Sequence, residues 1–261
     1  MSERRHKSTY SWRAKLGLIV PPTNTVNEAE WSRQMPDGVT FHTVRMAIHG
    51  DTHTGEGRRA LVADIATRVR ELAEARVDVV AYACTAGSMV HPPQALPAEV
   101  EATLMGVRAG AGANAAGIPV VTTAAAIVAA LHELAVSRVS IATPYHDALN
   151  AHEVEFLAAN GIETLRIAGL GLGANGPVDY PLIAQTQIEQ VEAHARAALV
   201  QGSDALLITC TDFPTLPLVD RLERELGLPV VTSNQATLWA SLRRAGITDT
   251  MTHSGRIFQR S

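Results

Sequence analysis

The stretches "VVAYACTAGSMV" (79–90) and "LLITCTDFPTL" (206–216) carry the strongest fold signal in the chain. Each is an apolar run that ends in Cys-Thr, and together they hold the only two cysteines among 261 residues. A short apolar run bounded by polar residues is typical of a strand buried in a parallel sheet. The sequence therefore places Cys84 and Cys210 at the carboxyl ends of two similar strands.

The segments on either side of these stretches repeat in the same order. "KLGLIVPPTN" (15–24) is similar to "RVSIATPYHD" (138–147), and "GIPVVTTAAAIVAAL" (117–131) is similar to "GLPVVTSNQATLWASL" (227–242). The loops between the repeated segments differ in length, because Cys84 lies 36 residues before Val120 whereas Cys210 lies 20 residues before Val230. This weak repeat predicts two similar lobes with unequal loops.

Short β-branched runs alternate with helical patterns along the whole chain, which indicates parallel βαβ construction. The helical periodicity is clearest over 57–75 and 183–200. The segment 39–46 alternates apolar and polar residues and is expected at or near a sheet edge. Strands are predicted at 14–20, 39–46, 77–83, 118–122, 138–143, 162–168, 204–209 and 228–232.

The fold class predicted from these patterns is α/β, with two similar parallel-sheet lobes related by a pseudo-twofold axis and an active site in the cleft between them. We expect an N-terminal lobe over 14–123 and a C-terminal lobe over 124–248, whose last helix could pack back on the first lobe. Residues 1–13 and 249–261 show no periodicity and are expected to be tails.

The composition excludes several classes of protein. A net charge of −4 and a pI near 6.2 argue against a nucleic-acid-binding surface, which needs a basic stripe. No apolar run approaches the roughly 20 residues that span a bilayer. The first thirteen residues carry no apolar signal segment, so we expect a cytoplasmic protein without a membrane partner. Two cysteines are too few for a disulfide scaffold.

Polar side chains gather at the predicted carboxyl ends of the strands, where open parallel sheets bind ligands. If the two lobes face each other, the two cysteines lie on opposite walls of one cleft. The polar residues at the strand ends are Asn24, Thr25, Cys84, Thr85, Ser88, Thr122, Thr123, Tyr145, Cys210, Thr211, Asp212, Ser233, Asn234 and Gln235.

Two facing thiols suit acid–base or nucleophilic chemistry on a small carboxylic acid. A helix N-terminus lowers the pKa of a thiol from its usual value of about 8.5, so an activated cysteine would react with iodoacetamide well below pH 8. One thiolate could then act as base or nucleophile while the other thiol donates a proton. The alternative, that both cysteines are buried hydrophobes, is disfavoured because the two Cys-Thr contexts match. Thr85, Thr211 and Asp212 are expected to cap helices.

The segments "GLIVPPTNT" (17–25), "ACTAGS" (83–88), "TPY" (143–145), "TCTDFPTL" (209–216) and "VVTSNQATLWASLRRAGI" (230–247) carry a family resemblance. With the repeated layout, they cover nearly the whole chain. The chain resembles the Asp/Glu racemase superfamily, and within it the branch of the maleate cis-trans isomerases and arylmalonate decarboxylases.

The resemblance implies an enzyme without cofactor or metal. In isomerase-like members, the first cysteine adds to the double bond of maleate, the second manages the proton, and rotation followed by elimination gives fumarate. Cys84 matches the nucleophile and Cys210 the second cysteine. Asn24, Tyr145 and Asn175 match carboxylate-binding residues. Further substrate contacts are expected from Thr25, Thr85, Thr211 and Asn234.

Other activities of the superfamily stay open at this point. An amino-acid or hydantoin racemase would use the two cysteines as opposed bases, and a binding protein would keep the fold without turnover. Decarboxylase-like members usually lack the first cysteine, so Cys84 counts against decarboxylation. A homo-oligomer is expected from the edge strand and the tail.

Four residues match no maleate-specific pattern: Trp31, Arg45, His49 and His53. An indole or a guanidinium group near the cleft would suit a larger substrate. His49 and His53 lie in a glycine-containing loop rather than on a helix, which disfavours a metal site. "GLGANG" (171–176) is interpreted as a loop over the cleft, because prolines delay the helix that a dinucleotide fingerprint requires.

Overall fold

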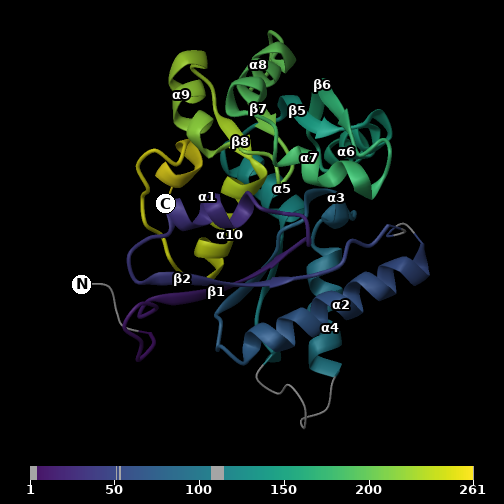
Figure 1. The fold of residues 1–261 in the computed structure, drawn as a ribbon. Helices are drawn as coiled ribbons and strands as arrows, with labels where there is room; N and C mark the ends of the chain where they lie inside the picture. The colour runs from purple at the N-terminus through teal and green to yellow at the C-terminus, as the bar shows by residue number, and fades with distance from the viewer. Residues whose placement is uncertain (1–4, 51, 53, 107–114, 261) are drawn as a thin grey trace.

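The computed structural model describes residues 5–50, 52, 54–106 and 115–260 of the chain. Among the described residues, eight parallel strands form two separate four-stranded sheets, one in each half of the sequence (Figure 1). The strands of the first sheet are β1 (Ala14–Val20), β2 (Val39–Arg45), β3 (Val79–Tyr82) and β4 (Val120–Thr122). Those of the second sheet are β5 (Arg138–Tyr145), β6 (Glu163–Leu172), β7 (Ala205–Ile208) and β8 (Val230–Thr232). The predicted α/β fold with two parallel-sheet lobes is confirmed.

The two sheets share one topology, which confirms the internal repeat. The strand order is β2-β1-β3-β4 in the first sheet and β6-β5-β7-β8 in the second. β1 and β3 therefore occupy the places that β5 and β7 occupy in the other half. The alternating segment over 39–46 forms the edge strand β2, as predicted, and most of its side chains are only half-buried.

Helices separate and cover the two sheets. They are α1 (Asn27–Gln34), α2 (Gly55–Ala73), α3 (Thr85–Ser88), α4 (Ala95–Gly106), α5 (Thr123–Glu133), α6 (Asp147–Ala159), α7 (Tyr180–Ile183), α8 (Ile188–Ala198), α9 (Leu216–Leu226) and α10 (Ser233–Arg244). Two short 3₁₀ helices, η2 (Pro177–Asp179) and η3 (Arg256–Gln259), complete the described elements.

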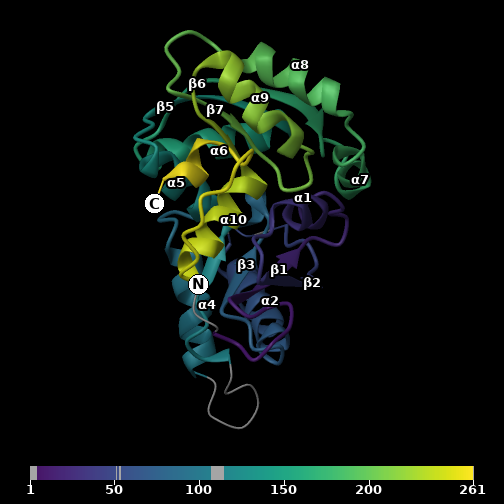
Figure 2. The same ribbon diagram turned by 90° about the vertical axis from the view of Figure 1, so that its left-hand side faces the viewer.

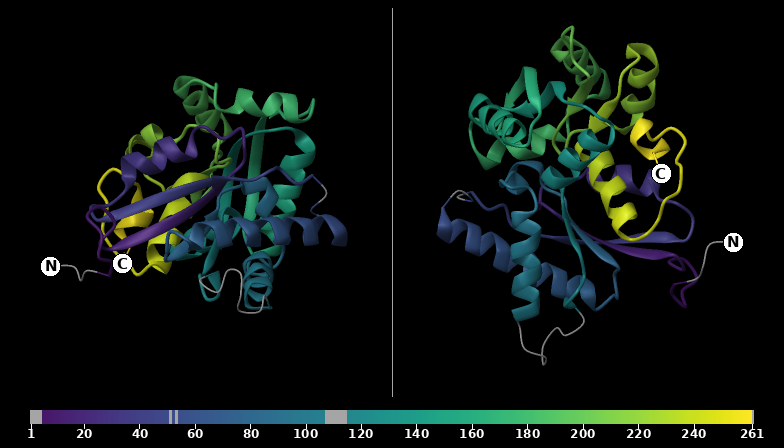
Figure 3. Two further views of the ribbon diagram at one scale, coloured as in Figure 1. Left: turned by 60° about the horizontal axis from the view of Figure 1, so that its bottom comes forward. Right: turned by 180° about the vertical axis from the view of Figure 1, so that it is seen from behind.

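The apolar core explains this layering. α2 and α4 pack on the outer face of the first sheet, and α8 and α9 pack on the outer face of the second (Figures 1 and 2). A central core containing α5 and α10 joins the inner faces of both sheets. α10 contacts β3 and β4 as well as its own β8, and it lies between the two halves in Figures 2 and 3. The two lobes thus share one continuous core.

The strand order fixes where a ligand site can form. In each sheet, the second strand along the chain pairs on one side of the first strand, and the third strand pairs on its other side. The connections from these strands therefore run in opposite directions beside the first strand. Ligands bind at such a switch point, outside the carboxyl ends of the strands. The switch point of the first sheet lies between the ends of β1 and β3, near Asn24 and Cys84. That of the second lies between β5 and β7, near Tyr145 and Cys210.

The prediction of a C-terminal tail is wrong. η3 buries Ile257 and Phe258 almost completely in the central core. The Ser254 carbonyl also accepts a hydrogen bond from Gln235 Nε2, at 2.7 Å. Two apolar residues in one short turn anchor the segment, and so short an anchor produces no periodicity for sequence analysis to detect.

The described part of the N-terminal segment is also attached to the fold. Arg13 forms an ion pair with Asp249, at 2.5 Å, and its Nη1 lies 2.6 Å from the same carboxylate. Arg5 Nη1 donates to the Ala245 carbonyl at 2.5 Å. The segment is polar because polar contacts, rather than apolar packing, fix it to the second half of the chain.

Candidate active site

One cavity of about 360 Å³ lies at the carboxyl ends of the two sheets. Its wall contains both cysteines, and these come from the corresponding strand ends β3 and β7. Seven of the polar strand-end residues predicted from sequence line it: Asn24, Cys84, Thr85, Tyr145, Cys210, Thr211 and Asp212. The structure therefore brings the two Cys-Thr corners to one space, and each sheet contributes one of them.

Cys84 occupies the N-cap of the one-turn helix α3. Its half-buried Sγ accepts a hydrogen bond from the Gly87 N–H at 3.4 Å. The Tyr82 hydroxyl also donates to this sulfur. A Cβ on residue 87 would lie 2.5 Å from Tyr82 Oη and 3.1 Å from Cys84 Sγ, so the contact requires glycine. The "CTAG" sequence thus forms a small cradle for one sulfur atom.

Cys210 is held in a backbone conformation that few side-chain-bearing residues adopt. Its φ is +101°, a conformation that costs about 1–3 kcal/mol and persists only where the surrounding contacts impose it. The Cys210 N–H donates to Ser233 Oγ at 2.9 Å, and Thr85 Oγ1 donates to the same oxygen at 2.9 Å. Ser233 therefore ties the strained Cys210 corner to the corner that holds Cys84.

Burial raises the pKa of both thiols. Desolvation raises the pKa of Cys84, and the bonds from Gly87 and Tyr82 oppose that effect only in part. Burial raises the pKa of Cys210 to about 12, and the bond from the Tyr145 hydroxyl again opposes it in part. The expectation that a helix N-terminus lowers these pKa values is wrong, because α3 has a single turn, no helix begins at Cys210, and burial of the thiols outweighs their hydrogen bonds.

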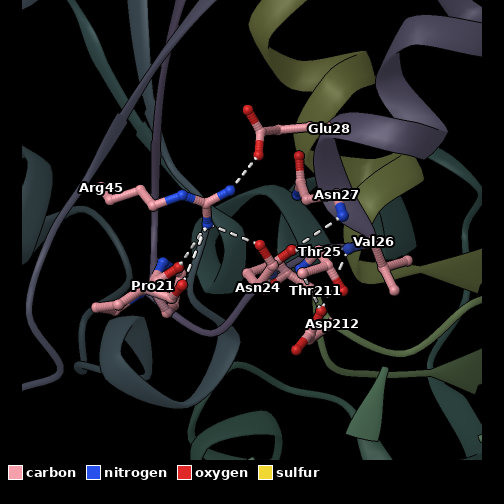
Figure 4. Close-up of polar contacts among 10 residues, drawn as sticks. Pro21, Asn24, Thr25, Val26, Asn27, Glu28, Arg45, Thr211 and Asp212 are labelled. Atoms are coloured by element: carbon pink, nitrogen blue, oxygen red, sulfur yellow. Dashed lines mark hydrogen bonds and ion pairs between the residues drawn. The ribbon is translucent and has the colours of Figure 1, made fainter. Parts of the chain in front are cut away.

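The loop between β1 and α1 presents Asn24 to the cavity (Figure 4). Asn24 Oδ1 accepts the N–H groups of Val26 and Asn27, at 3.2 and 3.0 Å. Its Nδ2 donates to Thr211 Oγ1 at 3.1 Å, and that hydroxyl donates to the Ala83 carbonyl. The asparagine thus fixes its own loop and crosses to the loop that follows Cys210.

Asp212 forms a second connection between the same loops. Its Oδ1 accepts the N–H groups of Thr25 and Val26, at 2.8 and 3.2 Å (Figure 4). The prediction that it caps the helix after β7 is wrong, because it binds the backbone that leads into α1. Thr85 and Thr211 do not cap helices either: Thr85 donates to Ser233, and Thr211 bonds to Asn24 and Ala83.

Three predicted substrate-binding residues lie outside the cavity wall. Thr25 is exposed and contributes only its backbone N–H to Asp212. The Asn175 amide donates to Asp179 at 3.1 Å. The Asn234 amide is buried and donates to Glu30 Oε2 at 2.8 Å and to the Thr211 carbonyl at 3.1 Å. The sequence pattern could not show which way each of these side chains faces.

Trp31 and Arg45, which match no maleate-specific pattern, stabilise the fold and do not line the cavity. Trp31 is fully buried, packs edge-to-face on Phe41, and donates its indole N–H to the Asn234 carbonyl. Arg45 donates to the carbonyls of the loop that follows β1, over residues 21–24, while pairing with Glu28 (Figure 4). The interpretation of these two as groups that face a larger substrate is therefore wrong.

His49 does line the cavity, and its Nε2 lies 3.0 Å from Asp64 Oδ2. His53 falls outside the described residues. Within the described ranges, the structure shows no group of three or more His, Cys, Asp or Glu side chains arranged to hold a metal ion. The segment "GLGANG" borders the cavity through Leu172, the last residue of β6, and through Gly173, whose N–H donates to Asp179.

Sequence reasoning missed several cavity residues. Tyr82, which contacts Cys84, points into the site from within a strand that the sequence shows only as apolar. His146 and His152 line the wall from the start and the middle of α6. Buried Glu153, one residue further along that helix, accepts from Thr209 Oγ1, and burial raises its pKa to about 8. A carboxylate inside an ordinary amphipathic helix gives no sequence signal of burial.

Known proteins share both this fold and this sequence pattern. The arylmalonate decarboxylase family model matches residues 16–258. The chain belongs to the arylmalonate decarboxylase family. A curated relative, the maleate isomerase of Nocardia farcinica, is 32% identical over 250 residues, which cover 94% of this chain and 95% of that protein. The arylmalonate decarboxylase of Bordetella bronchiseptica is 28% identical, with 88% and 90% covered.

Solved structures agree with this assignment. A cysteine-to-serine mutant of the Nocardia farcinica maleate cis-trans isomerase, with a covalently bound succinylcysteine intermediate, superposes with a TM-score of 0.79 at 29% identity, covering 95% of this chain and 99% of that one. Arylmalonate decarboxylase superposes at 0.77 and 26% identity, with 95% and 100% covered. The chain lies on the maleate isomerase branch of the Asp/Glu racemase superfamily and is an isomerase.

In the part of the chain that the structure describes, no helix is both long enough and apolar enough to cross a membrane.

Proposed function

We propose that the protein is a cofactor-independent cis-trans isomerase that converts maleate to fumarate with a pair of cysteines. The observation that carries this proposal is the convergence of Cys84 and Cys210, from equivalent strand ends of two sheets, on one cavity. In this proposal, the two sulfur atoms flank a small substrate. The maleate isomerases among its relatives support the choice of substrate.

The two cysteines have different surroundings, which suit different roles. Cys84 is only half-buried and receives hydrogen bonds from the Gly87 N–H and the Tyr82 hydroxyl, both of which stabilise a thiolate. Cys210 is 8% exposed and its pKa is raised to about 12, so it stays a thiol. Cys84 is therefore the nucleophile and Cys210 the proton donor.

The chemical steps balance without a further reactant. The Cys84 thiol first loses its proton to solvent, because only the thiolate adds. The thiolate then forms a C–S bond to one alkene carbon, and the electron pair of the double bond takes the Cys210 proton onto the other carbon. The product is a succinyl thioether with a rotatable C–C single bond. After rotation, the Cys210 thiolate removes the proton again, the double bond re-forms, and the C–S bond breaks to regenerate the Cys84 thiolate and release fumarate.

The cavity wall supplies hydrogen-bond donors for two carboxylates. Burial raises the pKa of Tyr145 well above its usual value, so its hydroxyl remains a donor at every physiological pH. Asn24 adds one amide N–H, because its Nδ2 carries two hydrogens and donates only one of them to Thr211, whereas the hydroxyl protons of Thr85 and Thr211 are already donated to Ser233 and Ala83. The N–H groups of the first turn of α3 have no partner within the helix, and that turn follows Cys84 directly.

Proton NMR of maleate incubated with the enzyme tests this proposal. We expect fumarate from the wild type, no turnover from either Cys84→Ser or Cys210→Ser, and a covalent adduct with the mass of one maleate on Cys84 in the Cys210→Ser variant. No fumarate from the wild type would reject the substrate. An active Cys84→Ser variant would reject the assigned roles, and α-proton exchange on an amino acid instead would identify a racemase.

A further inference from the structure

Asp212 has one carboxylate oxygen that the protein leaves unsatisfied. The residue is 6% exposed and lines the cavity. Its Oδ1 accepts two backbone N–H groups, whereas Oδ2 is buried and has no hydrogen-bond partner among the described residues. Figure 4 shows this second oxygen pointing away from the loop that Oδ1 binds. Buried carboxylate oxygens are normally hydrogen-bonded, so Oδ2 needs a partner on the ligand: a donor if Asp212 is ionised, or an acceptor if Oδ2 carries a proton.

The charge around the cavity disfavours an ionised Asp212 beside a dicarboxylate. No lysine or arginine is among the described residues that line the wall. Arg45 lowers the pKa of Asp212 from a distance, but its guanidinium is already engaged by three carbonyls and Glu28. The other titratable side chains on the wall are His49, Tyr82, Cys84, Tyr145, His146, His152, Tyr180 and Cys210.

A proton resolves this conflict at low cost. Burial raises the pKa of Asp212 to about 6, against the opposing effect of the two N–H groups. At pH 7, roughly one molecule in ten therefore carries the proton before any ligand binds. A neighbouring carboxylate raises that fraction further, because two like charges in one site disfavour each other's ionised form.

We propose that Asp212 binds the substrate as a neutral carboxylic acid: it takes up one proton as the dicarboxylate enters and donates its Oδ2–H to one substrate carboxylate. This inference rests on the proposed function, since it assumes a dianionic ligand. Oδ1 keeps its bonds to Thr25 and Val26 throughout, so the loop that carries Asn24 holds the same position with and without the proton. The acid thus supplies a donor where the wall has no cation.

Asparagine at this position would imitate the protonated acid permanently. In Asp212→Asn, the side-chain oxygen can accept the same two N–H groups, and the amide nitrogen then donates into the cavity. Glu223→Gln is the matched control: Glu223 is also a buried carboxylate that accepts backbone N–H groups and has a raised pKa, but it lies outside the cavity wall.

The test measures fumarate binding by isothermal titration calorimetry between pH 6 and pH 8.5. Fumarate is the probe because it stays a dianion over this range, whereas maleate itself takes up a proton. In the wild type, we expect the Kd to rise about 50-fold between pH 6 and pH 8, because the protonated fraction of Asp212 falls from about one half to about 1%. Comparing two buffers should show nearly one proton taken up per fumarate bound. Glu223→Gln should match the wild type.

Asp212→Asn should bind fumarate with a Kd that changes little with pH and that equals or improves on the wild-type value at pH 8. A flat wild-type profile would overturn the proposal. So would an undiminished pH dependence in Asp212→Asn, which would assign the proton to the cavity histidines. Tighter wild-type binding of the half-amide fumaramate than of fumarate would show that Oδ2 accepts a bond instead. Proton-coupled fumarate binding without turnover of maleate would reject the proposed function alone.

Discussion

Removing the Ser233 hydroxyl should slow catalysis more than it impairs substrate binding. Ser233 is 1% exposed, and its Oγ accepts both the Cys210 N–H and the Thr85 hydroxyl. In Ser233→Ala, the Thr85 hydroxyl can turn toward the cavity, but the Cys210 N–H is left buried without a partner. An unsatisfied buried group of this kind costs about 1–3 kcal/mol. The free energy of unfolding should fall by about that amount.

The effect on the rate follows from the backbone of Cys210. Its φ of +101° costs about 1–3 kcal/mol, and the bond to Ser233 helps to impose it. Without that bond the corner can relax, and each turnover must restore the strained geometry before Cys210 can deliver its proton. At about 1.4 kcal/mol per tenfold in rate, kcat should fall by about 5- to 150-fold. KM should change less, because the carboxylate contacts lie elsewhere on the wall.

The control is Ser241→Ala, eight residues further along α10. Ser241 is equally buried, but its hydroxyl bonds to the Thr237 carbonyl within the helix and touches neither cysteine corner. It should lose little stability and keep its kcat. Chemical denaturation and steady-state kinetics of both variants, with Ser233→Thr as the variant that retains a hydroxyl, make the comparison. An unchanged kcat in Ser233→Ala, or an equal loss in Ser241→Ala, would refute the positioning role.

Two further predictions concern the sulfur atoms. Gly87→Ala should reduce kcat at least tenfold, because the added Cβ would lie 2.5 Å from Tyr82 Oη and 3.1 Å from Cys84 Sγ. Adding Tyr82→Phe to this variant removes the hydroxyl that clashes and should recover part of the lost kcat. Iodoacetamide should alkylate the unliganded enzyme slowly at pH 7 and faster as the pH rises, because burial raises the pKa of both thiols. Cys84 should react before Cys210 because its side chain is more exposed. Mass spectrometry of the digested protein reads out the order, and rapid labelling at pH 7 would contradict the assigned protonation states.

The sequence predicted the strands well because their pattern is local. Each buried strand is a short apolar run, and the duplicated order of the runs reproduces the shared topology of the two sheets. It also placed Cys84 and Cys210 correctly at strand ends, since a strand end follows directly from where the apolar run stops. The segment 249–261 was missed because two buried residues, Ile257 and Phe258, are too few to form a pattern.

The direction of a polar side chain was much harder to predict. Asn24 and Asn234 both follow strands, yet Asn24 lines the cavity while Asn234 is turned into a buried network with Glu30. Nothing in the residues around Asn234 shows that a glutamate 204 positions away will accept its amide. The same limit applies to Asp212, whose partners Thr25 and Val26 belong to the other half of the chain. Contacts between the lobes have no local signature.

These contacts between the lobes are what the catalytic geometry depends on. The two sulfur atoms come from different sheets, so no strand pairing fixes the distance between them. That distance is set by buried side-chain bonds that cross from one half to the other: Asn24 to Thr211, Thr211 to Ala83, Thr85 to Ser233, and Glu30 to the backbone N–H groups of Thr215 and Leu216. Ala83, Thr85 and Thr211 directly adjoin a cysteine. In this duplicated fold, hydrogen bonds between the two halves hold the two cysteines in position relative to each other. This role accounts for the buried polar groups at the site, where apolar side chains alone could have packed the core.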